Sequence, residues 1–275
     1  MPQNLETRVP DPEKDRVPPA VPRWGGAHFL VFRNLRVHTG GNPWTMAMYS
    51  IFEPILYLLA IGVGIGRLVG DVDGVNVTYA AFVAPGLLAT AVMNSALYET
   101  MEGAFVKFTH ERYYRAILFT PVSLTGIVAG EVAWAVLRGF VTAIGFLLVI
   151  TVFGLVSWPD ALVAAAGTLL VAFAFGSAGL AVTTRIRAWS DFQYVQLVLL
   201  PMFLFATTFY PVTVYPRVIQ VIVELLPLYH AIQLLRGCAL GRIDSGLVVS
   251  VLYLLVMGAL GLVVARRRWA RVMLH

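Results

Sequence analysis

Long apolar runs separated by short polar segments dominate this chain. A helix of about 20 apolar residues crosses a hydrocarbon core of about 30 Å, and six runs have roughly that length. The pattern therefore predicts an all-α polytopic membrane protein with six transmembrane helices. The third run can continue as helix back to Leu124. The predicted spans lie at about 44–66, 79–98, 138–156, 161–184, 192–210 and 247–265.

Composition agrees with this class. The 275 residues are 59% hydrophobic and only 13% charged, whereas about a quarter of the residues in a soluble domain are charged. A single cysteine, Cys238, excludes an intrachain disulfide and a multi-thiolate metal site. The net charge of +5 would favour nucleic acid in a soluble protein. Here membrane topology explains it, so we expect no nucleic-acid partner.

Basic residues predict the orientation in the membrane. Fifteen of the 20 Lys and Arg residues fall in segments that would share one compartment, and four fall in the opposite set. Basic residues collect on the cytoplasmic side, so both termini are predicted to be cytoplasmic. We also expect the membrane to be the plasma (inner) membrane. Residues 1–23 contain six prolines and no apolar run, which is typical of a disordered tail. Residues 24–275 then form one transmembrane domain.

Residues 24–42 are too short and too basic to span. Phe29, Phe32 and Leu35 recur at helical spacing there, which favours an amphipathic helix lying in the membrane interface. The alternative is a cytoplasmic extension of the first span. Gly40, Gly41 and Pro43 interrupt such an extension.

Residues 211–237 also depart from simple spans. Pro211, Pro216 and Pro227 divide this apolar segment into pieces too short to cross, because proline ends helices and restricts the residue before it. We therefore predict a re-entrant hairpin of two short helices on the outer side. Such backbone is tolerated at membrane depth only when protein or a cavity surrounds it.

The predicted cytoplasmic loop 99–121 is unusually rich in charged and aromatic residues. A turn between membrane helices needs only a few polar residues, so this segment is predicted to contact something. Its charged and aromatic residues include Glu99, Glu102, Phe105, Lys107, Phe108, Glu111, Arg112, Tyr113, Tyr114 and Arg115.

Catalytic motifs are missing from the sequence. No phosphate-binding G-x-x-x-x-G-K-[ST] loop occurs, and the five histidines lack metal-ligand spacing. We therefore assign no catalytic residue and no metal site.

Three charged residues fall at membrane depth, where each costs at least about 2.5–3.5 kcal/mol at a helix centre. They are Glu53, Glu131 and Arg138. Glu131 and Arg138 share a helix face but lie about 10 Å apart by helical rise, too far to pair directly. One interpretation is a proton relay or a substrate contact. We favour the other, in which each charge pairs with a neighbouring helix or subunit.

The order of these elements resembles a known family. An interfacial helix, a charged aromatic loop after the second span and a proline-broken hairpin before the last span are typical of the membrane subunits of ABC-2 type exporters. The segments Ala84–Ala135 and Thr208–Gly237 are most similar to the NodJ-like branch, the lipooligosaccharide exporter permeases. The resemblance extends from Trp24 to the end of the chain.

The resemblance implies a permease homodimer that binds two copies of a separate ABC ATPase. ATP and Mg²⁺ would be held by that partner, and this chain would bind no cofactor and would not be an enzyme. A coupling helix would dock on the ATPase through aromatic and arginine anchors; the alternative is a loop lying on anionic lipid. The expected docking residues are Glu111, Arg112, Tyr113, Tyr114 and Arg115.

The resemblance also implies a path for an amphiphilic substrate through the bilayer, walled by the first, second and fifth spans. A glycolipid or lipooligosaccharide is the expected cargo. The residues expected along the path and at its outer gate are Phe203, Phe205, Phe209, Tyr210 and Pro211.

Three other functions stay open at this point. A multidrug efflux permease would share the same architecture. A proton-coupled secondary transporter would use Glu53 and Glu131 as carriers. A membrane enzyme acting on lipid-linked sugars would need a cluster of acids or histidines facing one compartment, which the sequence does not provide.

Overall fold

The computed structural model describes most of the chain beyond the N-terminal tail. The residues 1–23 predicted to be a tail, almost all of the predicted first span and Glu53 lie outside the described residues. Side chains of residues 38–40, 115, 116 and 274 are not described. The described ranges are 25–40, 52, 55–57, 59–60, 78–109, 113–117, 120, 122–242 and 244–274.

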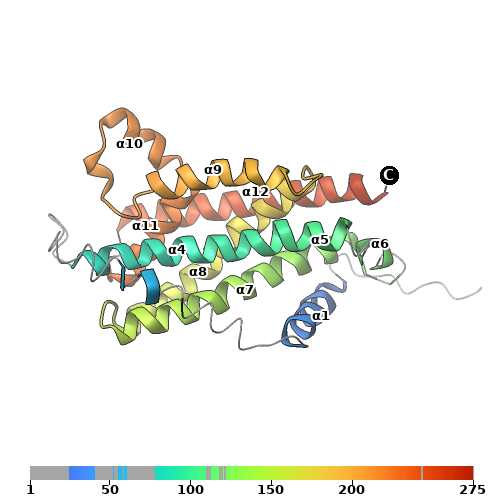
Figure 1. Ribbon diagram of the computed structural model, residues 1–275, viewed down its shortest axis with the longest axis horizontal. Helices are drawn as coiled ribbons and strands as arrows, with labels where there is room; N and C mark the ends of the chain where they lie inside the picture. Colours follow the sequence, from blue (N-terminus) through green and yellow to red (C-terminus); the bar gives the residue numbers. More distant parts are fainter. Residues whose placement is uncertain are drawn as a thin grey trace, which may run out of the picture.

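Four long apolar helices form a bundle. They are α4 (Tyr79–Tyr98), α7 (Leu124–Val152), α8 (Trp158–Thr183) and α12 (Ser245–Leu274). Helix α8 contacts the other three, and α4 also packs on α7 (Figure 1). Within the described ranges, four helices are long and apolar enough to cross a membrane, or up to five if a bent helix pair counts as one. The chain is therefore a helical membrane protein.

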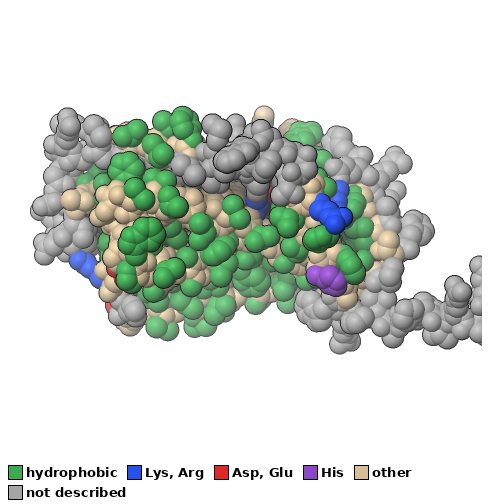
Figure 2. Space-filling model, turned by 90° about the horizontal axis from the view of Figure 1, so that it is seen from below, with side chains coloured by type: hydrophobic (Ala, Val, Ile, Leu, Met, Phe, Trp, Pro, Cys, Tyr) green, Lys and Arg blue, Asp and Glu red, His purple; other side chains and the backbone are tan. Residues whose placement is uncertain are grey.

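The bundle has an apolar core and an apolar surface. Leu88, Phe146 and Ile150 are fully buried between the helices. Large side chains such as Leu252 and Leu260 of α12 face outward, and Figure 2 shows one face covered largely by hydrophobic side chains. A helix surface of this kind is suited to lipid or to another membrane helix.

Hydroxyl caps set where three of the long helices begin. The side chains of Thr78, Ser123 and Ser157 accept the N–H groups of Ala81, Gly126 and Asp160, respectively. Such caps satisfy the free N–H groups of a first helical turn. Because Ser123 caps α7, this helix begins at Leu124, about four turns before the predicted span start near residue 138.

The predicted loop 99–121 is partly helical. Helix α4 continues through a π-helical turn, η2 (Glu99–Gly103), into α5 (Ala104–Thr109), and these three segments together form 31 helical residues. A short helix, α6 (Tyr113–Ile117), follows. The expectation of a loop from Glu99 onward was wrong for its first half, because the polar residues there have buried partners.

The segment before α12 is broken as its prolines predicted. Helix α9 (Asp191–Phe205) is followed by a short 3₁₀ turn, η3 (Val212–Val214), by α10 (Arg217–Glu224) and by α11 (Pro227–Ala239). Helices α10 and α11 are bent by 84°, and α11 packs on α4, α8 and α12. Helix α9 has 15 residues, about 22 Å of helix, so it is shorter than the predicted span 192–210.

Helix α1 (Ala27–Gly40) lies on the start of α7 at the opposite end of the bundle from α10 (Figure 1). Leu30 and Asn34 are buried, whereas Phe29 and Phe32 are exposed. The segment is helical with one buried and one exposed side, and its location in the membrane interface stays a prediction. We call the end of the bundle that holds α1, α5, α6 and the last turns of α12 the basic end, and the end that holds α10 and α11 the hairpin end.

Helix α12 approaches α8 closely at Gly261. A Cβ added there would lie 2.8 Å from the backbone nitrogen of Ala178. We expect Gly261→Val to destabilise the protein by about 1–3 kcal/mol, because the two backbones must separate. Thermal unfolding in detergent checks this, with Leu260→Val on the exposed side of the same helix as the control. Equal stability of the two variants would contradict the packing.

Candidate functional site

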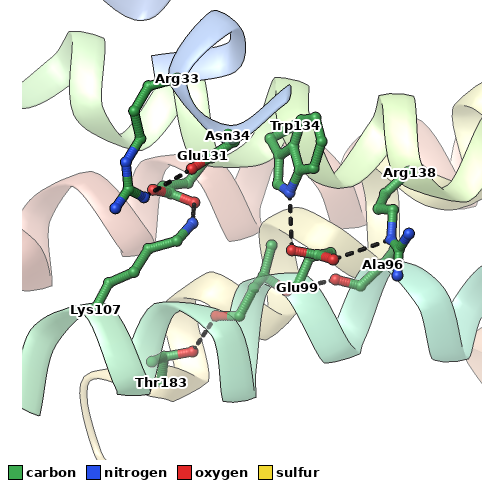
Figure 3. Close-up of polar contacts among 10 residues, drawn as sticks. Arg33, Asn34, Ala96, Glu99, Lys107, Glu131, Trp134, Arg138 and Thr183 are labelled. Atoms are coloured by element: carbon green, nitrogen blue, oxygen red, sulfur yellow. Dashed lines mark hydrogen bonds and ion pairs between the residues drawn. The ribbon is translucent and has the colours of Figure 1, made fainter. Parts of the chain in front are cut away.

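A buried carboxylate, Glu99, joins α4 to α7 in the bundle (Figure 3). Its two oxygens accept the Trp134 Nε1–H at 2.8 Å and the Arg138 Nε–H at 3.0 Å. Glu99 is 2% exposed, so its charge is removed from water. Charge-assisted hydrogen bonds of this kind are the strong ones, and they offset the cost of burying the carboxylate.

Glu99 begins the π-helical turn η2, which is supported from a second side. A π turn changes the helical register and leaves a carbonyl without its usual donor. The Thr183 Oγ1 lies 2.6 Å from the Thr100 carbonyl and 2.9 Å from the Gly179 carbonyl, so its hydroxyl can donate to either. The turn is thereby held between α7 and α8.

A second buried ion pair lies nearer the basic end. The Lys107 Nζ donates to Glu131 Oε2 at 2.7 Å, and the two side chains are 8% and 1% exposed. Lys107 belongs to α5 and Glu131 to α7. Removing one partner of such a pair leaves an uncompensated charge in a low-dielectric site. The pair therefore fixes α5 against α7.

Aromatic contacts join α5 and α6 to the end of α12. The Tyr114 ring packs edge-to-face on Trp269, with centroids 4.8 Å apart, and Phe108 packs on both rings. The Trp269 Nε1–H donates to the Leu180 carbonyl at 3.2 Å. One tryptophan thus connects α6, α8 and α12. We call Phe108, Tyr114 and Trp269 the aromatic cluster.

Helix α1 also contacts α6. The guanidinium carbon of Arg33 lies 4.0 Å from the centre of the Tyr113 ring, a cation–π geometry. Tyr113 and Tyr114 lie next to one another, with ring centroids 5.5 Å apart. The short helix α6 is therefore held between α1 on one side and α12 on the other.

Tyr114 is a neutral phenol in this setting. Burial raises the pKa of Tyr114 well above its usual value, and the neighbouring Glu131 carboxylate raises it further. Both effects disfavour a second negative charge beside Glu131.

The five expected docking residues differ in their surroundings. Tyr114 is 1% exposed, so the expectation that its side chain contacts a partner was wrong; it packs inside the chain. Tyr113 is half-buried. Glu111 and Arg112 lie outside the described residues, as does the side chain of Arg115. These three and Tyr113 stay predictions.

Two of the three membrane-depth charges have partners on neighbouring elements, and the third, Glu53, lies outside the described residues. Glu131 pairs with Lys107 and Arg138 with Glu99. Glu99 and Lys107 were predicted to lie in a loop, so the sequence pattern did not identify them as these partners. Trp134 and Trp269 had no predicted role. The available signal was the lack of a helix breaker, because no proline or glycine lies between Gly86 and Gly103.

The expected gate residues lie at the hairpin end. Phe203 and Phe209 pack edge-to-face, with centroids 5.4 Å apart. Phe205 packs on Tyr215, and the Tyr210 and Tyr215 hydroxyls are 2.7 Å apart. Pro211 lines a cavity beside them. The expectation therefore missed Tyr215, which holds this group together.

Among the residues with described side chains, no group of three or more His, Cys, Asp or Glu side chains could hold a metal ion. The polar groups brought together here serve packing and charge pairing.

Comparison with known proteins identifies the architecture. Residues 29–240 match the ABC-2 type transporter family. The chain is 35% identical to nodulation protein J of Sinorhizobium fredii over 203 residues, covering 74% of this chain and 77% of that protein. It is 33% identical to nodulation protein J of Rhizobium leguminosarum bv. viciae over 227 residues, covering 81% and 87%. It is 31% identical to the inner membrane transport permease YadH of Escherichia coli K12 over 221 residues, covering 78% and 83%.

The bundle defines a polytopic α-helical membrane protein without a phosphate-binding loop in its sequence. The family match covers more than half of the chain. The chain belongs to the ABC-2 type transporter family, and it is a permease-type membrane subunit.

The Lys107–Glu131 pair predicts a specific pattern of stability. We expect Lys107→Met to destabilise the protein by about 3–5 kcal/mol, because Glu131 stays buried without its partner. The double variant Lys107→Met/Glu131→Leu should be more stable than Lys107→Met alone. Unfolding in a detergent series measures both.

Arg187→Met, which removes an exposed cation near the same end, is the matched control and should change stability little. Additive losses in the double variant would contradict the buried pair.

Proposed function

We propose that this chain is the membrane-spanning permease of an ATP-driven exporter whose ATPase is a separate subunit. Membership of the ABC-2 type transporter family supports this proposal. The sequence has no phosphate-binding loop of its own, so the energy of transport must come from a partner. The assembled exporter contains two permease copies, two ATPase subunits and ATP with Mg²⁺ in the latter.

The basic end is the proposed docking side, and it faces the cytoplasm. The single observation that carries this assignment is the packing of Tyr114 on Trp269. This contact ties a short helix with neighbouring Arg112 and Arg115 to the end of a transmembrane helix. A partner that binds residues 111–115 therefore acts on α12 through the aromatic cluster.

A second connection leads from the same segment to α7. Helix α5 immediately precedes the docking residues and is held to α7 by the Lys107–Glu131 pair. When ATP closes the two ATPase subunits, movement of the docking segment reaches α12 and α7 together. Packed cores transmit such shifts because they are not freely deformable. This is how we propose that ATP binding opens the permease.

The proposed cargo is an amphiphile such as a glycolipid or a lipooligosaccharide, moved from the cytoplasm or the inner leaflet. The aromatic residues at the hairpin end, with Phe203, Phe209 and Tyr210 among them, form an apolar and partly hydroxylated surface suited to a lipid tail. Both termini are proposed to be cytoplasmic and the membrane to be the inner membrane.

A proton-coupled mechanism is less well supported by the geometry. A proton carrier needs contact with water in at least one state. Glu131 is 1% exposed and already paired with Lys107. The multidrug alternative shares the same ATPase requirement and differs only in cargo.

Docking is tested by co-expression and co-purification of this chain with its candidate ABC ATPase subunit. We expect Arg112→Ala/Arg115→Ala to reduce the recovered complex at least about ten-fold, because aromatic and arginine anchors carry most of the energy of an interface. Transport in reconstituted vesicles should fall with it.

Arg217→Ala is the matched control, since Arg217 is an exposed arginine of α10 at the hairpin end. It should leave complex recovery unchanged. Full recovery and full transport with Arg112→Ala/Arg115→Ala would overturn the docking proposal.

A further inference from the structure

The hairpin end contains a cavity that shares Pro211 with the expected gate residues but whose polar groups the proposed docking and gating roles do not use. Its volume is about 530 Å³, within the range of small-molecule sites. It lies between α10, α11, the start of α12 and Phe82 of α4. Its polar lining includes Glu224, His230, Gln233, Arg236, Arg242 and Asp244.

Arg236 is the most deeply buried cation of this lining, at 8% exposed. Its Nε–H donates to the Phe82 carbonyl at 3.3 Å and its Nη2–H to the Thr207 carbonyl at 2.9 Å. The guanidinium carbon lies 3.9 Å from the centre of the Phe82 ring. Two carbonyls and one ring face thus hold the guanidinium in a single orientation.

The Thr207 carbonyl is positioned at a conformational cost. Thr207 has φ 64°, a left-handed conformation that is rare for a β-branched residue. Strain of this kind persists only where the surroundings impose it, and it gathers at functional sites. Here it directs a carbonyl at Arg236.

No carboxylate lies within ion-pair distance of Arg236 among the described residues. A buried cation without a counter-charge is costly, and the neutral carbonyls and ring compensate it only in part. We propose that the cavity binds an oxyanion, namely a phosphate, sulfate or carboxylate group, whose negative charge pairs with Arg236. The site is independent of the proposed export function.

The other charges of the lining act less strongly on such a ligand. Arg242 and Asp244 are exposed, so water and salt screen them, and Asp244 Oδ1 already accepts the Leu247 N–H at 3.0 Å. Glu224 is half-buried and opposes an anion. His230 is held by Ser250 at 3.2 Å and stacks on Tyr253.

Calorimetric titration of the permease alone, in an uncharged detergent, tests the site with two probes. Inorganic phosphate represents a free anion, and dodecyl phosphate represents the head group of an amphiphile. We expect saturable binding of at least one probe. Binding of phosphate itself identifies a site for free anions, whereas binding of dodecyl phosphate alone identifies a head-group site.

Variants then locate the binding. Arg236→Gln should weaken it at least about ten-fold, because a hydrogen-bonded charge partner is lost. Arg217→Gln on α10, outside the cavity lining, should leave it unchanged. Glu224→Gln should tighten binding, and Val249→Trp should block it by filling the cavity from its exposed rim.

The last two variants keep the test decisive if Arg236→Gln does not fold. Absence of saturable binding of both probes to the wild-type chain would overturn the proposal, as would equal binding to wild type and Val249→Trp. Because no ATPase is present, failure here leaves the docking test unaffected.

Discussion

The ion pair between Lys107 and Glu131 is the constraint on which the basic end depends. Both side chains are almost fully buried, so neither can leave the other without exposing a charge to an apolar interior. The pair holds α5 on α7, and the short distance from α5 to α6 then places Tyr114 on Trp269. Without the pair, α6 would be held to the bundle only by its contacts with α1 and with the aromatic cluster.

Glu99 is a second buried carboxylate with polar partners, and it lies nearer the hairpin end than Glu131. Its carboxylate is satisfied by Trp134 and Arg138, and the π turn beside it is satisfied by Thr183. Glu99, on the extension of α4, therefore pairs with Arg138 of α7. Glu131 of α7 pairs with Lys107, which lies on that same extension. This reciprocal pairing allows a continuous helix of 31 residues to carry charges inside an otherwise apolar bundle.

Much of the architecture could be predicted from the sequence. The length of an apolar run predicts a membrane-spanning helix, and the position of a proline predicts where a helix ends. The helices α4, α8 and α12 and the broken pair α10–α11 follow from those two signals. The polar partners could not be predicted in the same way. Charge in residues 99–109 was typical of a solvated loop, and only the tertiary contacts of Glu99 and Lys107 make a buried helix the better solution. Tyr114 was misjudged for the same reason, since an aromatic residue between arginines suits an interface and a core equally well.

The central claim is that the docking segment 111–115 has two partners: Tyr114 of α6 is turned into the chain, and the neighbouring Arg112 is proposed to bind the ATPase. Single cysteines at positions 112 and 114, in a Cys238→Ala background, can be labelled with a membrane-impermeant maleimide with and without the ATPase. The account predicts that position 112 reacts and is protected when the ATPase binds, whereas position 114 is unreactive in both states. Rapid labelling at position 114, or labelling at position 112 that the ATPase does not change, would contradict it.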